Sequence, residues 1–152
     1  MKLVDILTPD SILLDLKAQG KREALEEICK FLSDAKRLPD PASLVKTLLD
    51  REALGSTGIG QGVAIPHGKS AAVTGQSAAL ALSKRGVAFD ALDGEPVHIL
   101  FLLVAPPDAA AVHLKALAKV SRLLKDKFFR QALRDASSAE EILKIIREED
   151  DY

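Results

Sequence analysis

Five segments of the chain carry apolar residues at the spacing of an amphipathic helix, with polar residues between them. The pattern predicts helices over about 21–34, from 41 to near 55, from 109 to about 124, over roughly 127–135 and from 139 onward. Capping signals support three of these starts: Asp40 before Pro41, Asp108, and Ser138 with Glu141 three residues later. Helices are therefore expected to dominate the regular structure.

Between the helices lie shorter apolar runs that are typical of strands. They cover 11–16, 63–65, 77–83 and 96–105, and a turn over 91–94 separates the last two. The run 96–105 is apolar almost throughout, which indicates a strand covered on both faces. Because strands and helices interleave, the predicted fold class is α/β, a single domain over 1–152 with a small mixed, partly parallel sheet flanked by helices on both faces.

The segment 55–68 holds five of the nine glycines, which predicts a loop around the short strand at 63–65. Its continuation, GVAIPHGKS, looks like a phosphate-binding loop because it finishes on Gly-Lys-Ser. A P-loop has four residues between its glycines, whereas five residues separate Gly62 from Gly68. Pro66 also lacks the N–H group that such a loop donates. The spacing and the chemistry exclude a nucleotide site, and no cofactor is expected.

Composition narrows the class of protein further. Hydrophobic residues are 47% and charged residues 28%, and the net charge of −1 gives no global field toward nucleic acid or an anionic membrane. The N-terminal segment is interrupted by Asp5 and Asp10, and the longest purely apolar run, 99–107, is too short to span a membrane. The single cysteine, Cys29, falls in the apolar stripe of its helix and is expected to be buried. We expect a soluble, cytoplasmic protein.

Two of the three histidines have simple structural interpretations. His98 lies inside the apolar run, on the predicted face of Leu100, where a core or sheet-edge role is expected. His113 begins the inward stripe of its helix, where it is either a satisfied structural residue or the border of a pocket. Nothing local distinguishes these two interpretations of His113.

His67 has unusual neighbours. Pro66 fixes the backbone before the ring, and Gly68 lets another backbone or a phosphate approach closely. The ring is therefore expected to leave the strand at a stiff corner on the surface, which favours a functional role. The chain has no G-x-S-x-G elbow and no H-E-x-x-H or H-x-x-x-H pair, so neither a serine hydrolase nor a metal site is expected.

A mounted imidazole can attack phosphorus directly, because a pKa of about 6.5 leaves its lone pair available near neutral pH. An incoming phosphoryl dianion also needs donors around it. The candidates near His67 are the hydroxyls of Ser56 and Thr57, the backbone at Gly68 and the guanidinium of Arg51. For Arg51, a solvated helix end is the simpler local interpretation, and only its closeness to the glycine segment favours a role.

The residues around His67 also match the sequence pattern of a known protein family. The stretch REALGSTGIGQGVAIPHGKS, residues 51–70, resembles the active-site segment of enzyme IIA domains of the fructose/mannitol type in the bacterial phosphotransferase system, most of all the nitrogen-regulatory branch. The stretches HLKALAKVSRLLKD, 113–126, and FDALDGEPVHILFLLVAPP, 89–107, and the tail over 138–149 extend the likeness over nearly the whole chain. The resemblance implies a mixed sheet between helix layers, as the hydrophobic pattern indicates independently.

The resemblance implies a phosphocarrier rather than a multiple-turnover enzyme. His67 would receive a phosphoryl group from the phosphohistidine of the small histidine-phosphocarrier protein. His113 would be the second active-site histidine and Arg51 the cation beside it, whereas His98 matches no active-site position. Because phosphate is carried and not hydrolysed, no metal and no water-activating base are expected.

Three functions stay open. The first is a nitrogen-branch protein whose phosphorylation state regulates other proteins, the second a sugar-specific enzyme IIA that passes phosphate to an enzyme IIB domain, and the third a regulatory binding module. The printed chain holds no fused IIB or membrane domain, which favours regulation. A shallow site is expected, because a small protein must reach His67. Leu54, Ile59 and Val63 are candidates for its rim, although core packing is the expected fate of Val63.

Overall fold

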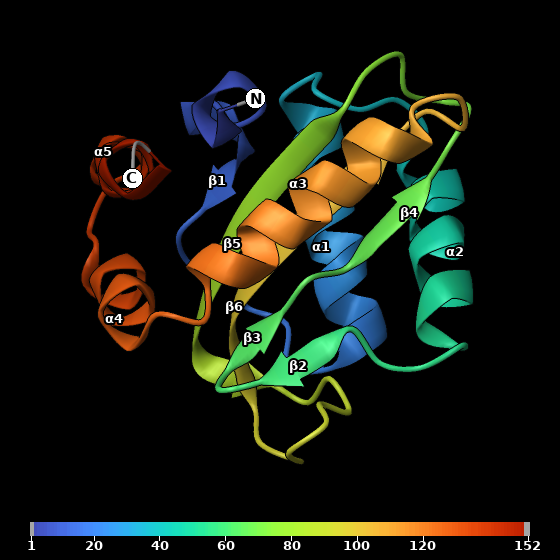
Figure 1. The fold of residues 1–152 in the computed structure, drawn as a ribbon. Coiled ribbons are helices and arrows are strands. Elements are labelled where there is room, and N and C mark those ends of the chain that lie inside the picture. Colours follow the sequence, from blue (N-terminus) through green and yellow to red (C-terminus); the bar gives the residue numbers. More distant parts are fainter. Residues whose placement is uncertain (1, 151–152) are drawn as a thin grey trace.

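The computed structural model describes residues 2–150, which form one mixed sheet between layers of helices (Figure 1). The strands are β1 (Ile12–Leu13), β2 (Gly58–Gly60), β3 (Val63–Ala64), β4 (His67–Lys69), β5 (Ser77–Val87) and β6 (Val97–Ala105). The α-helices are α1 (Lys21–Asp34), α2 (Pro41–Glu52), α3 (Ala110–Leu123), α4 (Lys127–Asp135) and α5 (Ala139–Asp150), and the short 3-10 turns η1 (Leu3–Asp5) and η2 (Pro9–Ser11) precede β1. The predicted α/β class and partly parallel sheet are confirmed.

Strand β6 is the centre of the sheet. It pairs antiparallel with β5 on one side and parallel with β3 and β4 on the other, and the order across the sheet is β1-β5-β6-β3-β2. Apart from the half-buried His98, the residues of β6 are buried on both faces, as their apolar run predicts. Because β3 and β4 both lie along the same edge of β6, the corner at Pro66 falls between them and His67 lies opposite Leu103.

Each face of the sheet packs its own apolar core. On one face, α1 and α2 cover alternate β6 residues from Leu100 to Val104. On the other face, α3, α4, α5 and the N-terminal turns cover alternate β6 residues from Ile99 to Leu103. Each fully buried Leu or Phe contributes about 1.5–3 kcal/mol relative to an exposed one. These two layers hold the end of α2 and the start of α3 on either side of β4 (Figure 1).

Two of the predicted helix caps are confirmed. The carboxylate of Asp40 accepts from the Ser43 N–H at 3.2 Å, with Pro41 at the first helical position. The hydroxyl oxygen of Ser138 accepts from the Glu141 N–H at 3.1 Å. The starts of α2 and α5 are therefore fixed by the residues that the sequence marks.

The predicted cap at Asp108 is wrong. The N–H of Ala109 donates to the carbonyl oxygen of Pro106 at 3.0 Å, so a turn occupies 106–109 before the helix begins. Helix α3 starts at Ala110 with Ala109 as its N-cap and without a side-chain cap. The turn after the two prolines thus moves the helix start beyond the reach of the Asp108 side chain.

The glycine segment is more regular than its composition predicts. Strand β2 pairs antiparallel with β3 through the two-residue turn Gln61–Gly62, whose φ angles of 61° and 78° fit a type I′ hairpin. The N–H of Gln61 also donates to the carboxylate of Asp93 at 3.0 Å. His67–Lys69 forms a further strand, β4, beside β6. Main-chain pairing with neighbours distant in sequence outweighs the flexibility of the glycines.

The bounds of two other strands also differ from the prediction. β1 is limited to Ile12–Leu13, because only these residues form a regular ladder with β5; beyond them a single backbone bond, from the Leu16 N–H to the carbonyl oxygen of Leu82 at 2.9 Å, continues the contact. β5 continues beyond 83 as far as Val87, past a register shift between Leu82 and Val87. The polar residues Lys84 and Arg85 fall in this irregular part and interrupt the apolar run, so the sequence does not predict the end of the strand.

The predicted face of His98 is wrong. The register shift in the β5–β6 pair breaks the alternation of β6 between Val97, which belongs to one core, and Ile99, which belongs to the other. His98 is half-buried and lines a surface cavity of about 200 Å³ with Leu82 and with residues of α4. It therefore lies on the α4 side of the sheet and not with Leu100.

Three further expectations concern single features. Cys29 is buried in α1 as predicted, and burial raises the pKa of its thiol to about 12, which makes it unreactive. Over residues 2–150, the structure contains no helix with the length and apolar content needed to cross a bilayer. Val63 is only 1% exposed, so it packs in the core, as expected, and contributes nothing to a surface rim.

Candidate functional site

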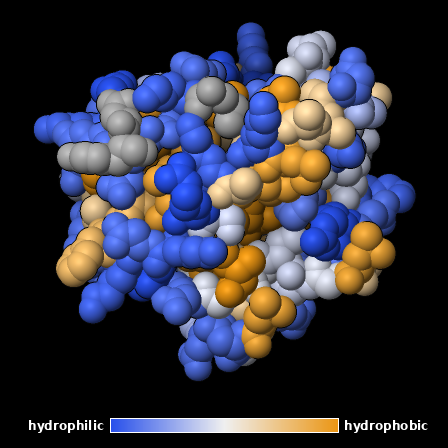
Figure 2. Space-filling model, in the orientation of Figure 1, coloured by the Kyte–Doolittle hydropathy of each residue, from blue (hydrophilic) through white to orange (hydrophobic). Residues whose placement is uncertain are grey.

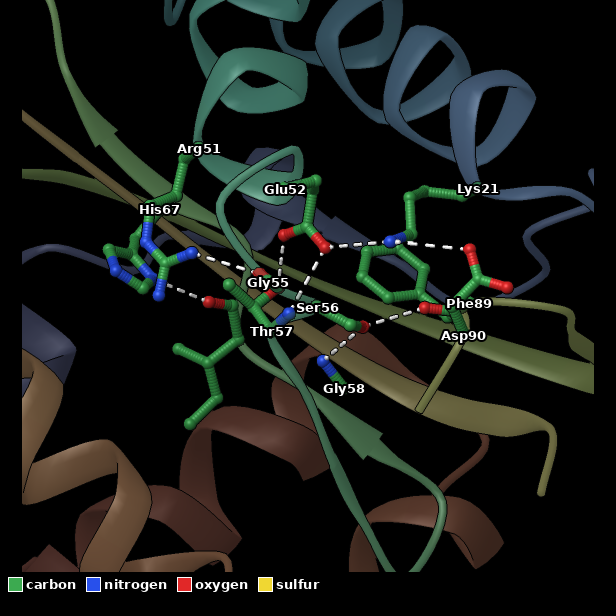
Figure 3. Close-up of polar contacts among 11 residues, drawn as sticks. Lys21, Arg51, Glu52, Gly55, Ser56, Thr57, Gly58, His67, Phe89 and Asp90 are labelled. Atoms are coloured by element: carbon green, nitrogen blue, oxygen red, sulfur yellow. Dashed lines mark hydrogen bonds and ion pairs between the residues drawn. The ribbon is translucent and has the colours of Figure 1, made fainter. Parts of the chain in front are cut away.

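His67 is the first residue of β4, immediately after the corner at Pro66. Its ring nitrogen Nδ1 lies 2.8 Å from the carbonyl oxygen of Ile65 (Figure 3). A carbonyl oxygen only accepts hydrogen bonds, so Nδ1 must carry the proton and donate it. In the neutral ring, the other nitrogen, Nε2, then holds the lone pair. The backbone around His67 thus selects the tautomer of its ring.

The backbone on both sides of this bond is fixed. The carbonyl oxygen of Pro66 accepts from the Leu103 N–H at 2.9 Å, which ties the corner to β6. The N–H of Ile65 donates to the carbonyl oxygen of Thr57 at 3.1 Å, which ties the preceding residue to the glycine segment. The two residues before His67 are therefore held in place by hydrogen bonds, which limits the movement of its half-buried ring.

His113 lies on the first turns of α3 and is only 3% exposed. Its ring centre lies 5.7 Å from that of His67, with the two planes tilted by 50°. Burial, and to a smaller degree the charges of His67 and Lys69, hold the pKa of His113 below its usual value, so the ring is neutral at physiological pH. Its Nδ1 is buried without a hydrogen-bond partner among the described residues. The structure thus brings the two predicted histidines together.

Arg51 lies in the last turn of α2, and its Nη1 donates to the carbonyl oxygen of Gly55 at 2.9 Å. Figure 3 shows its side chain running from the end of α2 toward the imidazole of His67. Helix α2 packs on β4 through Thr47, whose methyl carbon lies 2.9 Å from the place of a Cβ at Gly68. Arg51 is one helical turn beyond Thr47 on the same face, which directs it to the same strand.

The contact with Thr47 also explains Gly68. Any side chain at this position would meet α2, so the absence of a Cβ permits close packing of the helix on the strand. A role of the Gly68 backbone toward phosphate remains a prediction.

The two predicted hydroxyl donors are engaged within the protein. The hydroxyl of Ser56 donates to the carbonyl oxygen of Phe89 at 2.8 Å and accepts from the Gly58 N–H at 3.0 Å. The buried hydroxyl of Thr57 donates to the carboxylate of Glu52. Each hydroxyl has a single proton to donate, so neither can donate to a second acceptor while these bonds last. The bonds hold the glycine segment in place. A role of either hydroxyl toward a phosphoryl group would require that it leave its present acceptor.

Two charged residues near the site were missed by the sequence reasoning. Lys69 is on the same strand as His67, two residues along, so strand periodicity places its ammonium on the same face. Its charge is one of the causes that lower the pKa of His113. Glu52, next to Arg51, is only 7% exposed and holds the glycine segment. No local pattern distinguishes a buried glutamate at a helix end from a solvated one.

His98 is separate from this site. Its Nδ1 donates to the carbonyl oxygen of Ser83 at 2.8 Å, and its cavity is lined by α4 residues such as Gln131 and Arg134. None of the residues described above around His67 lines that cavity, which opens beside α4. The expected structural role of His98 agrees with this placement.

Exposed apolar side chains flank His113 in the sequence and occur at the start of the glycine segment. Val112 and Leu114 flank His113 and are 45% and 66% exposed, and Leu54, beside the glycine segment, is 84% exposed. Figure 2 shows hydrophobic surface between α3 and the strands that carry His67. Among residues 2–150, no group of three or more His, Cys, Asp or Glu side chains is arranged to hold a metal ion. The site therefore combines an imidazole with its lone pair on Nε2, a second imidazole, a guanidinium and exposed apolar side chains.

Comparison with known proteins shows the family to which the chain belongs. The family model for the phosphoenolpyruvate-dependent sugar phosphotransferase system, EIIA 2, matches residues 5–149. A nitrogen regulatory protein of Bradyrhizobium diazoefficiens is 38% identical over 96% of this chain and 95% of its own length. The fructose-specific EIIABC component of Bacillus subtilis is 37% identical over 99% of this chain, which spans only 24% of that longer protein.

A solved structure gives the same result. The crystal structure of nitrogen regulatory protein IIA-Ntr from Neisseria meningitidis superposes with a TM-score of 0.88 at 39% identity, covering 95% of this chain and 98% of that one. The sequence resemblance and the fold thus agree over nearly the full length. The chain belongs to the EIIA 2 family of the phosphoenolpyruvate-dependent sugar phosphotransferase system, and its role is that of a phosphocarrier.

Proposed function

We propose that His67 is the phosphoryl acceptor and that Nε2 is the atom modified. The observation that carries this proposal is the hydrogen bond from Nδ1 to the carbonyl oxygen of Ile65, which leaves the lone pair on Nε2. The neutral ring is itself the nucleophile, so the step needs no separate base. The Pro66 corner holds the ring in place, which reduces the entropy lost on reaching the reactive geometry.

The phosphoryl donor is a phosphohistidine on the small histidine-phosphocarrier protein. Nε2 of His67 attacks the phosphorus as the phosphorus–nitrogen bond of the donor breaks. The donor ring, protonated on its other nitrogen, leaves as a neutral imidazole with the electron pair of that bond. The ring of His67 becomes cationic, and its Nδ1–H stays on the carbonyl oxygen of Ile65, whose dipole stabilises the positive charge.

Arg51 and His113 stabilise the transferred group. A phosphoryl group carries about −1.5 to −2 charge, and catalysis of its transfer depends almost entirely on positioning and electrostatics. The guanidinium of Arg51 reaches toward the ring of His67, and the neutral ring of His113 is 5.7 Å away. The neutral ring of His113 can donate an N–H to a phosphoryl oxygen. Because it is uncharged, it does not repel the guanidinium of Arg51 before the phosphoryl group arrives.

A protein donor fits the surroundings better than a small phosphorylated metabolite does. The exposed side chains of Leu54, Val112 and Leu114 form an apolar surround, and Ile59, which is 41% exposed, extends it along β2. Exposed apolar surface around a reactive group is typical of protein docking. The expected rim residues Leu54 and Ile59 are retained in this proposal.

The branch of the system is proposed from the relatives. Nitrogen regulatory proteins match this chain over almost their full length, which favours a regulatory phosphocarrier of the nitrogen branch. The similar identity to a fructose-specific EIIABC component supports the alternative, transfer onward to an enzyme IIB domain in sugar uptake. Both functions use the same acceptor histidine.

Incubation with enzyme I, the histidine-phosphocarrier protein and phosphoenolpyruvate tests the acceptor. The wild-type chain should gain the mass of one phosphoryl group, and His67→Ala should gain none. His98→Ala is the matched control, because it removes a half-buried histidine of the same sheet that lies outside the site, and it should label normally. A label that survives in His67→Ala contradicts the proposal. Loss of the label on addition of a fructose-type IIB domain would favour the sugar branch.

A further inference from the structure

We propose that Glu52 is a positioning residue for this site, acting through Thr57 on both His67 and Arg51. The proposal rests on the proposed function only because one of its tests measures the rate of phosphoryl transfer. Its structural part, the orientation of the His67 ring, can be measured without any donor. Glu52 touches neither the ring nor the incoming group, so it is not a catalytic residue.

The carboxylate of Glu52 is buried and accepts three donors (Figure 3). Oε1 accepts from the Thr57 N–H at 3.0 Å and lies 3.0 Å from the ammonium of Lys21. Oε2 accepts from the Thr57 hydroxyl. The side chains of Glu52 and Lys21 are only 3% and 16% exposed, so this ion pair is largely shielded from water. A buried carboxylate is tolerated only when it is paired and hydrogen-bonded in this way.

Lys21 is itself fixed from a second direction. Its ammonium lies 4.8 Å from the ring centre of Phe89 and 3.6 Å from the carboxylate of Asp90. The carbonyl oxygen of Phe89 in turn accepts the Ser56 hydroxyl. The start of α1, the end of α2, the glycine segment and the residues after β5 therefore meet around one carboxylate.

A continuous series of hydrogen bonds leads from this carboxylate to the acceptor ring. Glu52 holds the N–H and the hydroxyl of Thr57, and the carbonyl oxygen of Thr57 accepts from the Ile65 N–H at 3.1 Å. The carbonyl oxygen of Ile65 then accepts from Nδ1 of His67 at 2.8 Å. Each bond fixes the residue that makes the next one. Displacement of Thr57 would therefore move the carbonyl group that selects the reactive tautomer.

The same carboxylate closes the loop that receives Arg51. Glu52 and Thr57 bound the residues 53–56, and Arg51 donates to the carbonyl oxygen of Gly55 inside that loop. Because both ends of the loop are held by Glu52, the acceptor of the guanidinium has a defined place. The histidine and the arginine are thus placed by a single buried group.

The test compares Glu52→Gln with the wild-type chain. The variant keeps the shape of the side chain but removes the charge that pairs with Lys21, and its amide places an N–H group where an acceptor is needed. In the wild-type chain, ¹⁵N spectra of the neutral His67 ring should show the Nδ1–H tautomer alone. In Glu52→Gln they should show a mixture of tautomers. The transfer rate from the phosphocarrier protein should fall roughly 10- to 100-fold, the scale expected for misplacing reactive groups by about 1 Å.

Glu27→Gln is the matched control. The carboxylate of Glu27 also accepts from backbone N–H groups, those of Lys17 at 3.0 Å and Ala18 at 2.9 Å. These bonds join α1 to the segment before it and not to the glycine segment. A general loss of stability from breaking such bonds would appear in both variants. A change of the His67 tautomer should appear only in Glu52→Gln.

A second pair of variants keeps the proposal testable if Glu52→Gln does not fold. Thr57→Val removes the hydroxyl bond and should mix the tautomers, whereas Thr57→Ser retains it and should behave as the wild type does. A folded Glu52→Gln with the wild-type tautomer and rate would overturn the proposal, as would equal behaviour of the two Thr57 variants. If the wild-type chain accepts no phosphoryl group, the proposed function fails, but the tautomer comparison still decides the role of Glu52.

Discussion

Phosphorylation of His67 should raise the pKa of His113. In the unmodified protein, burial lowers this pKa most, and the charge that His67 carries when protonated and the charge of Lys69 lower it further, so the ring of His113 is neutral at physiological pH. A phosphoryl dianion on Nε2 of His67 reverses the sign of the local field. Because a negative charge stabilises the imidazolium form, His113 should take up a proton more readily after modification.

The ring separation sets the size of this effect. At the 5.7 Å between the two ring centres, an effective dielectric constant of about 20 gives about 2.9 kcal/mol per unit charge, and that of bulk water about 0.7 kcal/mol. The phosphoryl group carries a charge near −2 and the cationic ring of phosphorylated His67 carries +1, so the net charge is near −1. With about 1.4 kcal/mol per pKa unit, this charge gives a rise of about 0.5 unit with the screening of water and of about 2 units at the lower dielectric constant. The partly solvated surface near Arg51 favours a rise between these two values.

The assay is a histidine titration followed by NMR before and after chemical phosphorylation with phosphoramidate, which needs no partner protein. The resonances of His113 and His98 are compared, because His98 lies in a different cavity and should titrate equally in both forms. A rise in the pKa of His113 of less than about half a unit, or an equal rise at His98, would show that the phosphoryl group does not lie beside His113.

Three further outcomes follow from the structure. His67→Ala should leave the urea midpoint nearly unchanged, because the half-buried ring makes one side-chain hydrogen bond to Ile65, while labelling is lost. Arg51→Ala should slow phosphoryl transfer in rapid-quench assays by roughly 10- to 100-fold, less than the roughly 100- to 1000-fold loss of a preorganised oxyanion donor, because the residue is half-exposed. An equal loss in Lys46→Ala, which removes an exposed cation of the same helix, would contradict this role. Burial alone would raise the pKa of Asp150, but the ammonium of Lys119 and the Leu3 N–H lower it overall. Its stabilisation should therefore be complete above the unfolded pKa of about 3.9 and be lost as the pH falls through the folded value, and urea titrations of Asp150→Asn should show about 1–3 kcal/mol less stability at neutral pH with less of this acid dependence.

The helices were predictable because their signals are local. The stripe of α1 and the Asp40–Pro41 start of α2 lie within a few residues of one another, and both elements have nearly the predicted bounds. The strands β2 and β4 were missed because their partners, β3 and β6, are defined only by pairing in space. The face of His98 was wrong because a register shift leaves no mark in the hydrophobic pattern.

The candidate site shows the same division. His67 could be selected from Pro66 and Gly68, whereas the tautomer of its ring depends on the direction of the Ile65 carbonyl, which no composition or spacing reveals. The adjacency of His113 to His67 depends on how α3 packs on the sheet and reached the sequence reasoning only through the family resemblance. Glu52 was missed because its partner Lys21 lies at the start of a different helix.

The position of phosphorus on the ring tests the central claim most directly. After transfer from the phosphocarrier protein, ¹⁵N–³¹P couplings in the labelled chain identify the nitrogen that is bonded to phosphorus. The hydrogen bond from Nδ1 to Ile65 predicts phosphorus on Nε2 of His67. Phosphorus on Nδ1 of His67, or on either of the other two histidines, would contradict the account.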